Sequence, residues 1–359
     1  MLKTLLPRRL LGLLNLPTID QLKRMLKVAD PDSGYVHPGY QAMGLYVDDM
    51  EAQHAIVNRQ GEVQFNTGVE FPDLVYRGQV EEFTPCVPGL GRLRRLEDKL
   101  VAVCRNVAFE DVIRAHPYVK YCASQYFNGR PLHINFQGVA QHYGFHTDML
   151  DVTSNFDVAT FFACCEWNDD AGCYLPVVAR EAPGIIYSVE PAFYSMGLVE
   201  LAAEFSFVGW QPLPRPAQQR ASAFILPANQ CFASLPGVSK HYFRHDEQSA
   251  EAIWRAFDGG DVLFPEDEAA ELSRLAQDLG VVTTSQLARA WQILETWEGI
   301  GFKKKRRKGA FKASGLKIVE TAQLNWTRFN LPSKPEKLQD RLNSELDNVR
   351  FRMAYTPPA

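Results

Sequence analysis

The segment from residue 141 to residue 167 constrains the fold more than any other, because it joins a strand to a helix within a few residues. Residues 150–153 are strand-like, and residues 154–157 carry the small and polar side chains typical of a helix start. Apolar residues then recur at helical spacing, at Val158, Ala159, Phe162 and Cys165. The pattern predicts a strand that leads directly into a helix over residues 155–167.

Other strand and helix patterns divide the chain unevenly. Strand-like stretches are concentrated before about residue 230. They are residues 44–47, 74–76, 184–189 and 224–226, with a hairpin within residues 54–65. A capping box at residues 18–21 opens a helix to about residue 29. Helical spacing predicts further helices at residues 93–107, 266–278 and 285–297. This distribution predicts an α+β core with a helical C-terminal addition.

The composition excludes several classes of protein. A chain of 359 residues with 46% hydrophobic residues can bury a sizeable core, in two domains or in one large domain with additions. A net charge of −4 excludes a globally basic nucleic-acid binder but not a local basic patch. The seven cysteines contain no CxxC pair, so we expect reduced thiols in a cytoplasmic protein. No stretch approaches about 18 apolar residues, so no membrane span is expected.

The first candidate for chemistry is Arg77, within Tyr76-Arg77-Gly78-Gln79. An arginine at the end of a strand presents a planar fork of donors, and the glycine beside it gives close access to the backbone. This arrangement suits a phosphate or a carboxylate ligand. The alternative is an arginine that is paired with a carboxylate at the edge of the core.

The second candidate is the turn into the helix after residue 153. Backbone N–H groups at a helix start can hold an anion, and Thr153 can add a hydroxyl group there. The alternative is that Thr153 or Ser154 is simply the N-cap of the helix.

A metal site is conceivable in the same segment. His142 and His146 are four residues apart, with Asp148 and Asp151 nearby, and such a set would suit a metal-dependent hydrolase. Gly144 lies between the histidines, and no helical pattern places them on one face. We therefore assign no metal ligands.

A basic run lies in the C-terminal part of the chain. Its six consecutive members are Lys303, Lys304, Lys305, Arg306, Arg307 and Lys308. With Lys312 and Lys317 nearby, the run favours contact with a polyanion, each contact releasing counterions. The alternative is a solvated loop after Gly299 and Gly301.

Together, the Arg77 segment and the segment at 141–167 resemble the FRG domain family. The first block is Tyr76-Arg77-Gly78-Gln79 with Pro85, Pro88 and Arg92. The second block is Gln141-His142-Tyr143-Gly144, Thr147, Leu150-Asp151, Thr153, Asn155, Ala159 and Phe162-Ala163. Later matches are Glu97, Arg215 with Gln219, and Leu263-Phe264-Pro265. Two positions depart from the family pattern: Asp148 stands where arginine is usual, and Val152 where tryptophan is usual.

The resemblance implies a domain organisation and a fold. The FRG domain would occupy residues 71–268, after an N-terminal helix and hairpin region at 1–70 and before a helical region at 269–359 that contains the basic run. The family is similar in layout to the ADP-ribosyltransferase fold. We therefore expect a split, mixed or antiparallel β-sheet core with helical additions at both ends.

The same resemblance implies a site for NAD. Arg77 would bind the pyrophosphate or the nicotinamide ribose, and Thr153 would hold the ribose. Tyr76 or Tyr143 would stack on the nicotinamide. Gly78 and Asn155 complete the expected NAD-binding set, which is drawn from the matched blocks.

The catalytic groups that the resemblance implies are Arg77, Thr153, Gln219 and His142. Gln219, or Gln218 if the register slips, would take the third position of the site. A glutamine cannot act as a general base, so His142 is a candidate base, and Glu166, Glu247 or Asp151 are candidates to supply the negative charge.

Two functions follow from the resemblance. The first is an NAD-dependent ADP-ribosyltransferase-like enzyme that modifies a macromolecule, either protein or nucleic acid. The basic run at residues 303–308 would guide this acceptor. Members of the family resemble components of bacterial toxin or antiphage defence modules. The alternative is a non-catalytic FRG module that binds a nucleotide or phosphate and acts through a partner.

Overall fold

The computed structural model describes residues 15–26, 53–58, 60–67, 72, 74–178, 180–195, 203–347 and 349–354. The strand expected at residues 44–47 lies outside these ranges. Among the described residues, no helix is both long enough and apolar enough to cross a membrane.

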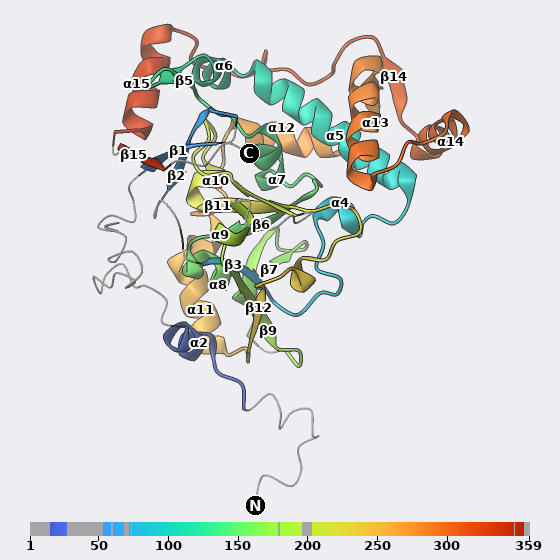
Figure 1. Ribbon diagram of the computed structural model, residues 1–359. Coiled ribbons are helices and arrows are strands. Elements are labelled where there is room, and N and C mark those ends of the chain that lie inside the picture. The colour runs from blue at the N-terminus through green and yellow to red at the C-terminus, as the bar shows by residue number, and fades with distance from the viewer. Residues whose placement is uncertain are drawn as a thin grey trace, which may run out of the picture.

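The centre of the molecule is a six-stranded sheet in the order β10-β11-β6-β3-β9-β12 (Figure 1). Its strands are β10 (Glu204–Phe207), β11 (Ala221–Ile225), β6 (Met149–Thr153), β3 (Val75–Gln79), β9 (Gly184–Val189) and β12 (Ser239–Phe243). Every neighbouring pair is antiparallel. The sheet and its surrounding helices confirm the α+β class.

The sheet is split between its two middle strands. β3 and β6 are paired only through Tyr76 and Thr153, near the start of β3 and at the end of β6. In contrast, β3 is paired with β9, and β6 with β11, over the full length of five residues. Beyond Tyr76 and Thr153, β3 and β6 therefore diverge.

One face of the sheet is covered by α8 (Phe156–Cys164), which follows β6 almost directly, as expected. Its N-cap is Asn155, whose side chain accepts hydrogen bonds from the backbone N–H groups of Asp157 and Val158. The expectation of a cap at Thr153 or Ser154 is therefore wrong, because the Thr153 hydroxyl accepts from the Asn155 backbone instead. The predicted helix also extends too far. Residues 165–168 form β7 (Cys165–Asn168), which takes its hydrogen bonds from β8 (Cys173–Pro176) across a tight turn.

A second group of helices packs around the long α5 (Leu96–Ala115). The helix is predicted at 93–107, but buried apolar residues continue to Ile113 and extend it. It ends where Pro117 disfavours helical geometry at His116. Its partners include α7 (Phe136–His142), α12 (Glu268–Gln277), α13 (Thr284–Glu298) and α14 (Lys304–Ser314).

The last described strand joins an N-terminal hairpin in a smaller sheet. The predicted hairpin is confirmed as β1 (Gln53–Val57) and β2 (Val63–Thr67), and β15 (Val349–Ala354) adds to β1 in parallel. The capping box of Thr18 and Gln21 is confirmed at α2 (Ile19–Met25). The remaining elements are α4 (Gly89–Arg92), α6 (Pro117–Ala123), β4 (Tyr126–Phe127), β5 (Arg130–Pro131), α9 (Ala192–Ser195), α10 (Arg215–Gln218), η2 (Phe232–Ser234), α11 (Glu247–Ala256), η3 (Asp258–Gly260), β13 (Val281–Thr283), β14 (Lys317–Val319) and α15 (Pro335–Glu345).

The C-terminal helices share a hydrophobic cluster with the rest of the protein. Trp291 and Leu294 of α13 pack with Leu100 and Val103 of α5. The indole N–H of Trp297 donates to the backbone carbonyl oxygen of Leu226, just beyond β11, at 2.9 Å. Residues after 269 are thus packed directly on the elements that surround the central sheet.

Gly78 sets how closely α8 approaches β3. A Cβ atom at this position would lie 1.8 Å from the carbonyl oxygen of Ala159. We predict that Gly78→Ala lowers the free energy of unfolding by about 1–3 kcal/mol or more, because backbone has to move. Urea unfolding followed by circular dichroism measures this. Gly309→Ala is the control, because its helical position has open space around it, and it should raise stability by about 0.5–1 kcal/mol. Equal stability of the Gly78→Ala variant and the wild type would contradict this packing.

Candidate functional site

The candidate site lies where β3 and β6 diverge. The segment after β3 contains α4, and the segment before β6 contains residues 143–148. These two segments are joined, because the backbone N–H of Leu90 donates to the carbonyl oxygen of Thr147 at 3.0 Å. The open end of the split is therefore bordered by loops from both strands.

Arg77 reaches across the split from β3. Its Nη1 donates to the backbone carbonyl oxygen of Asp151 in β6 at 2.7 Å. Its Nε is buried without a hydrogen-bond partner. Within the described ranges Arg77 makes no ion pair, so the expected alternative of a carboxylate-paired arginine is not what the structure has. The guanidinium group contacts the backbone of β6 just where the two strands cease to be paired.

Asp151 presents its carboxylate to the end of α7. Its Oδ2 accepts from Nε2 of Gln141 at 3.0 Å, while its Oδ1 lies 3.9 Å from Nε2 of His142. Both Asp151 Oδ1 and His142 Nε2 are buried and have no hydrogen-bond partner. The His142 ring and the Asp151 carboxylate thus face each other without a direct hydrogen bond.

Gln219 holds the other side of the His142 ring. Its Oε1 lies 2.9 Å from His142 Nδ1, and its Nε2 donates to the Leu263 carbonyl oxygen at 2.9 Å. Because the amide of Gln219 donates to Leu263, its oxygen accepts from Nδ1–H of His142. This arrangement leaves Nε2 of His142 as the free nitrogen, directed toward Asp151.

Buried polar atoms without partners gather at this split. Such atoms are uncommon in folded proteins, and each one needs an explanation. Five of those among the described residues belong to side chains at the split or on the adjoining strand β9: Arg77 Nε, Gln79 Oε1, His142 Nε2, Asp151 Oδ1 and Tyr187 OH. Tyr187 is directly opposite Arg77 in the ladder between β3 and β9. This concentration makes the split the candidate binding site of the described structure.

A second arginine adds positive charge. Burial, followed by repulsion from Arg77, lowers the pKa of Arg92, which ends α4. The pKa of His146 is also lowered, by burial and then by Arg92, which favours its neutral form. Within the described part of the chain, Arg92 also lacks an ion pair, so two guanidinium groups near the split are free to bind an anion.

One comparison with known proteins found a match in this part of the chain. Residues 72–172 match the family model of the FRG domain. The chain contains an FRG domain. No curated protein and no solved structure matches the chain. The matched residues include β3, α4, α7, β6 and α8, and hence both sides of the split.

The structure distributes the expected site residues of the FRG domain over three environments. Arg77, His142 and Gln219 are gathered around Asp151, as described above. Thr153 is buried at the end of β6, and its hydroxyl oxygen accepts from the Asn155 backbone at 3.0 Å, which leaves its own hydrogen free to donate. Asn155 is engaged as the cap of α8.

The three remaining expected residues are packed into the core. The ring of Tyr76 packs on the ring of Phe156, on the α8 side of the sheet, with 5.1 Å between the ring centroids. Tyr143 is 1% exposed, its hydroxyl donates to Asp267, and Arg215 lies over its ring at 4.6 Å. Gly78 faces α8 rather than the split. These three residues therefore lie in the packing around the site.

The three candidates for a catalytic carboxylate differ in their exposure and in their distance from His142. Glu166 is exposed on β7 and pairs with Arg180 at 3.1 Å. Glu247 is exposed in the first turn of α11. Asp151 alone of the three lies beside His142. Among the described residues, no group of three His, Cys, Asp or Glu side chains is arranged to hold a metal ion.

Sequence reasoning assigned no role to four of the groups at this site. Gln79, Arg92 and Gln141 stand within the quoted FRG motifs, so their signal was present but their roles needed the geometry. Tyr187 stands in a stretch that reads as a plain buried strand, and its polar end gives no signal in the hydrophobic pattern.

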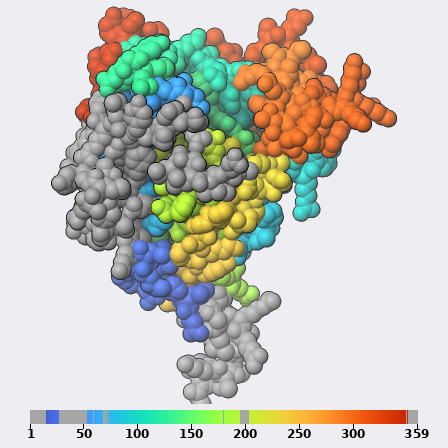
Figure 2. Space-filling view, in the orientation of Figure 1, coloured from blue at the N-terminus to red at the C-terminus, as the bar shows by residue number. Residues whose placement is uncertain are grey.

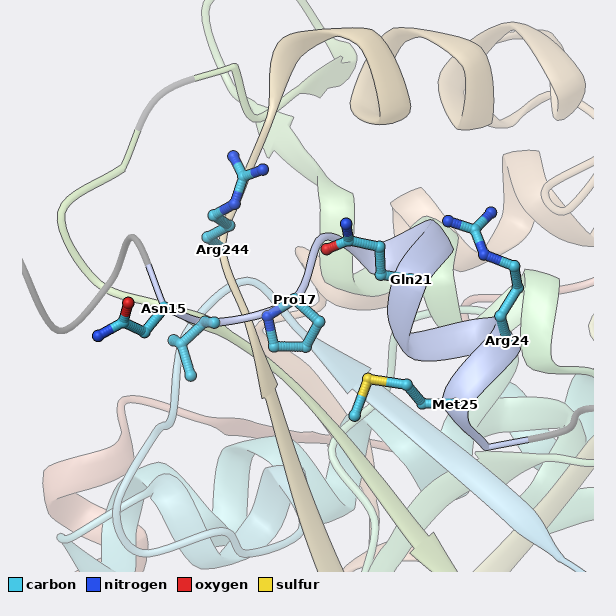
Figure 3. A pocket seen from close by; sticks show the side chains of 7 residues that line it. Asn15, Pro17, Gln21, Arg24, Met25 and Arg244 are labelled. Atoms are coloured by element: carbon cyan, nitrogen blue, oxygen red, sulfur yellow. The ribbon is translucent and has the colours of Figure 1, made fainter.

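The cavities described by the structure lie away from the split. One of about 670 Å³ is lined by Pro17, Gln21, Arg24, Met25 and Arg244, with Asn15 and Leu16, beside α2 (Figure 3). Another of about 500 Å³ lies between α5 and residues 322–327. Neither is lined by an expected site residue.

Asp148, the charge reversal in the FRG motif, is bound to α7. Its Oδ1 accepts from Nε2 of Gln137, and the acidic Glu110 is nearby. Burial raises the pKa of Asp148 to about 6. The departure therefore places a buried carboxylate, which destabilises the fold when it is charged, beside α7.

This cost predicts a pH-dependent stability. Because the folded pKa of Asp148 lies above its ordinary value of 3.8, the folded protein binds more protons than the unfolded chain between about pH 4 and 6. Stability from this group is therefore lost as the pH rises through that window. We predict that Asp148→Asn is more stable than the wild type by about 1–2 kcal/mol at pH 7, and that the difference disappears near pH 4. Thermal unfolding across this range measures it, and a difference independent of pH would contradict the assignment.

Proposed function

We propose that the FRG domain binds NAD at the split between β3 and β6 and transfers its ADP-ribosyl group to a macromolecule. The observation that carries the proposal is the set of five unpartnered buried polar atoms around Arg77, Asp151 and His142. β3 and β6 are also the first two strands of the central sheet in chain order, which agrees with the expected placement of Arg77 and Thr153 on consecutive strands.

The residues at the split fit a dinucleotide by charge and by hydrogen bonding. Arg77 and Arg92 offer guanidinium groups without carboxylate partners, which suit a pyrophosphate. The Thr153 hydroxyl can donate to a ribose oxygen, and Gln79 Oε1 can accept from a ribose hydroxyl or a carboxamide. In this proposal the aromatic residues Tyr76 and Tyr143 no longer stack on the nicotinamide, because both are packed in the core.

Residues at the split can each take a separate role in the transfer reaction. In the transfer, the bond between the nicotinamide nitrogen and the ribose carbon breaks, and nicotinamide leaves with the bonding electrons. Positive charge then develops on the ribose, and the carboxylate of Asp151 can stabilise it. An acceptor hydroxyl, amine or ring nitrogen forms the new bond and gives its proton to Nε2 of His142. Gln219 takes no part in bond making but fixes the His142 ring.

A non-catalytic module that binds a nucleotide remains the second candidate function. One observation favours it: both ends of the Gln219 amide are bound within the protein, so the expected third catalytic position does not face a ligand. In this case Arg77 and Arg92 bind phosphate, and the domain acts through a partner.

Arg77 tests whether either function is present. We predict that Arg77→Ala abolishes both the rise in melting temperature caused by NAD and the release of nicotinamide, because the phosphate contact is lost. Arg105→Ala is the matched control: Arg105 also donates to a backbone carbonyl oxygen, that of Leu279, at 3.1 Å, but lies on α5. It should retain both activities. Calorimetric melting and chromatography of nicotinamide provide the measurements.

The outcomes separate the two functions. NAD binding with nicotinamide release in the wild type supports the transferase. Stabilisation by NAD or another nucleotide without release, lost in Arg77→Ala, supports the binding module. A wild type that no nucleotide stabilises would contradict both.

Gln219 tests the role of His142. We predict that His142→Ala lowers the rate of transfer by about 10²–10⁴-fold. Gln219→Leu should also lower kcat, by about tenfold or more, with little change in NAD affinity, because Gln219 contacts His142 rather than ligand. Gln286→Leu is the control, since Gln286 is a buried glutamine bonded at both amide ends in α13. A Gln219→Leu variant that changes only stability, as Gln286→Leu should, would show that Gln219 is merely structural.

A further inference from the structure

The basic run forms a helix rather than a solvated loop. α14 (Lys304–Ser314) begins within the run, and Lys303 is its N-cap. Residues 303–317 hold eight lysines and arginines and no acidic residue, in a chain of net charge −4. The positive charge is thus gathered on one element, which Figure 1 places at the edge of the molecule beyond α13.

The two arginines of the run differ from its lysines, because each contacts another side chain of the protein. Arg307 pairs with Glu295 of α13 at 2.5 Å. Arg306 lies over the ring of Phe302 at 4.9 Å but stays exposed. The ion pair of Arg307 links α14 to α13, and most of the charge that remains open to a partner belongs to the lysines.

The six lysines of this region are exposed and free. They are Lys303, Lys304, Lys305, Lys308, Lys312 and Lys317. Within the described residues, none of them makes an ion pair. We name this set the lysine surface, and Figure 2 shows the orange atoms of this region projecting at the upper right of the molecule.

The lysine surface costs stability where it stands. Lys304, Lys308 and Lys312 repeat every four residues, so like charges are neighbours on one face of the helix. Lys304 and Lys305 also lie in the first turn, where the helix dipole disfavours cations. The helix is nevertheless held in place, because Phe302, Ala310 and Leu316 are buried in the cluster formed with α5 and α13.

We infer that the lysine surface binds the phosphate backbone of a nucleic acid. Lysines spaced over eight helical residues span about 12 Å, which is the rise of about three phosphates along one strand. Most of the free groups are lysine ammonium groups, which are point charges and suit contact with phosphates irrespective of base sequence. The inference names nucleic acid as the class of acceptor in the proposed transfer. The role of the nucleic acid as acceptor rests on the proposed function.

A membrane surface fits less well. An amphipathic helix that lies on lipid presents large apolar side chains beside its lysines. The apolar side chains of α14 instead face the protein core, and the other exposed positions between its lysines are Arg306, Gly309 and Ala313. Exposed Ile300 and Ile318 flank the helix but are not part of it.

The lysine surface is connected to the candidate site through one hydrophobic cluster. Leu90 of α4, two residues before Arg92, is buried in the same cluster as Ala310 of α14, together with residues of α5 and α13. A nucleic acid bound to α14 would therefore be held by an element that shares this cluster with the loop bordering the split.

A charge-matched pair of variants tests the inference. We predict that Lys304→Gln/Lys305→Gln/Lys308→Gln weakens binding to labelled duplexes of DNA and RNA at least tenfold. The slope of log affinity against log salt should fall by about 2–3, since each lost phosphate contact contributes about 0.9. Lys120→Gln/Lys334→Gln/Lys337→Gln removes the same charge from exposed positions on α6 and beside or on α15, and should bind as the wild type does. Fluorescence anisotropy in the absence of NAD measures all three proteins.

The remaining outcomes are decisive. The Lys304→Gln/Lys305→Gln/Lys308→Gln variant should have a melting temperature no lower than that of the wild type, because it relieves repulsion between lysines. Unfolding would then not explain its loss of binding. A preference for DNA or for RNA identifies the polymer, and both results support the inference. Equal binding by the two triple variants, or lysine-dependent binding only to phosphatidylserine vesicles, would overturn it.

The test is independent of NAD chemistry. Arg77→Ala should bind duplexes as the wild type does. If the wild type binds duplexes through the lysine surface but releases no nicotinamide, the transferase proposal fails and the nucleic-acid surface stands. If nicotinamide is released but duplexes are not bound, the surface fails and the transferase needs another acceptor.

Discussion

The candidate site depends on the point at which two neighbouring strands stop pairing. β3 and β6 share only the pair of Tyr76 and Thr153 before they diverge. A sheet interior normally satisfies its backbone groups through the ladder, so the divergence leaves the β6 carbonyl of Asp151 in need of a donor. Arg77 supplies it at 2.7 Å. Arg77 thereby brings a positive charge into the centre of the sheet, and no ion pair to it is found in the described part of the chain. The other polar groups of the site are arranged around this charge.

Packing on the far side of the sheet makes this arrangement possible. Gly78 follows Arg77 and has no side chain, so α8 can lie against β3 with Ala159 almost touching the strand. Tyr76 precedes Arg77 and packs on Phe156 at the start of α8. Because strand residues alternate between faces, the contacts that Tyr76 and Gly78 make with α8 leave Arg77 directed to the opposite side. Packing thus explains part of the Tyr-Arg-Gly sequence: the outer two residues position the helix, and the middle one reaches across the split to Asp151.

Much of this could be predicted from the sequence, and the limits have physical causes. Local patterns identified β9 (Gly184–Val189), the hairpin of β1 and β2, and the strand that leads into α8, because each depends on neighbours along the chain. The helix at 155–167 was predicted three residues too long, because Cys165 takes its backbone partners from β8, which no helical pattern reveals. Gln219 was expected to face a ligand for a similar reason: its partners, His142 and Leu263, are distant in sequence. Tyr187 joins the site only through its pairing with β3.

The relation between His142, Gln219 and Asp151 gives Gln219 a role that requires no charge. Leu263 accepts from the Gln219 amide, which directs its oxygen to His142 Nδ1 and so leaves Nε2 as the basic nitrogen. That nitrogen faces Asp151 Oδ1 at 3.9 Å, too far for a direct hydrogen bond. A negative charge and a proton acceptor are therefore held apart rather than neutralised against each other. The closing Leu263-Phe264-Pro265 element, more than a hundred residues from Asp151 in the chain, belongs to this arrangement because its first carbonyl group decides which nitrogen of His142 is free.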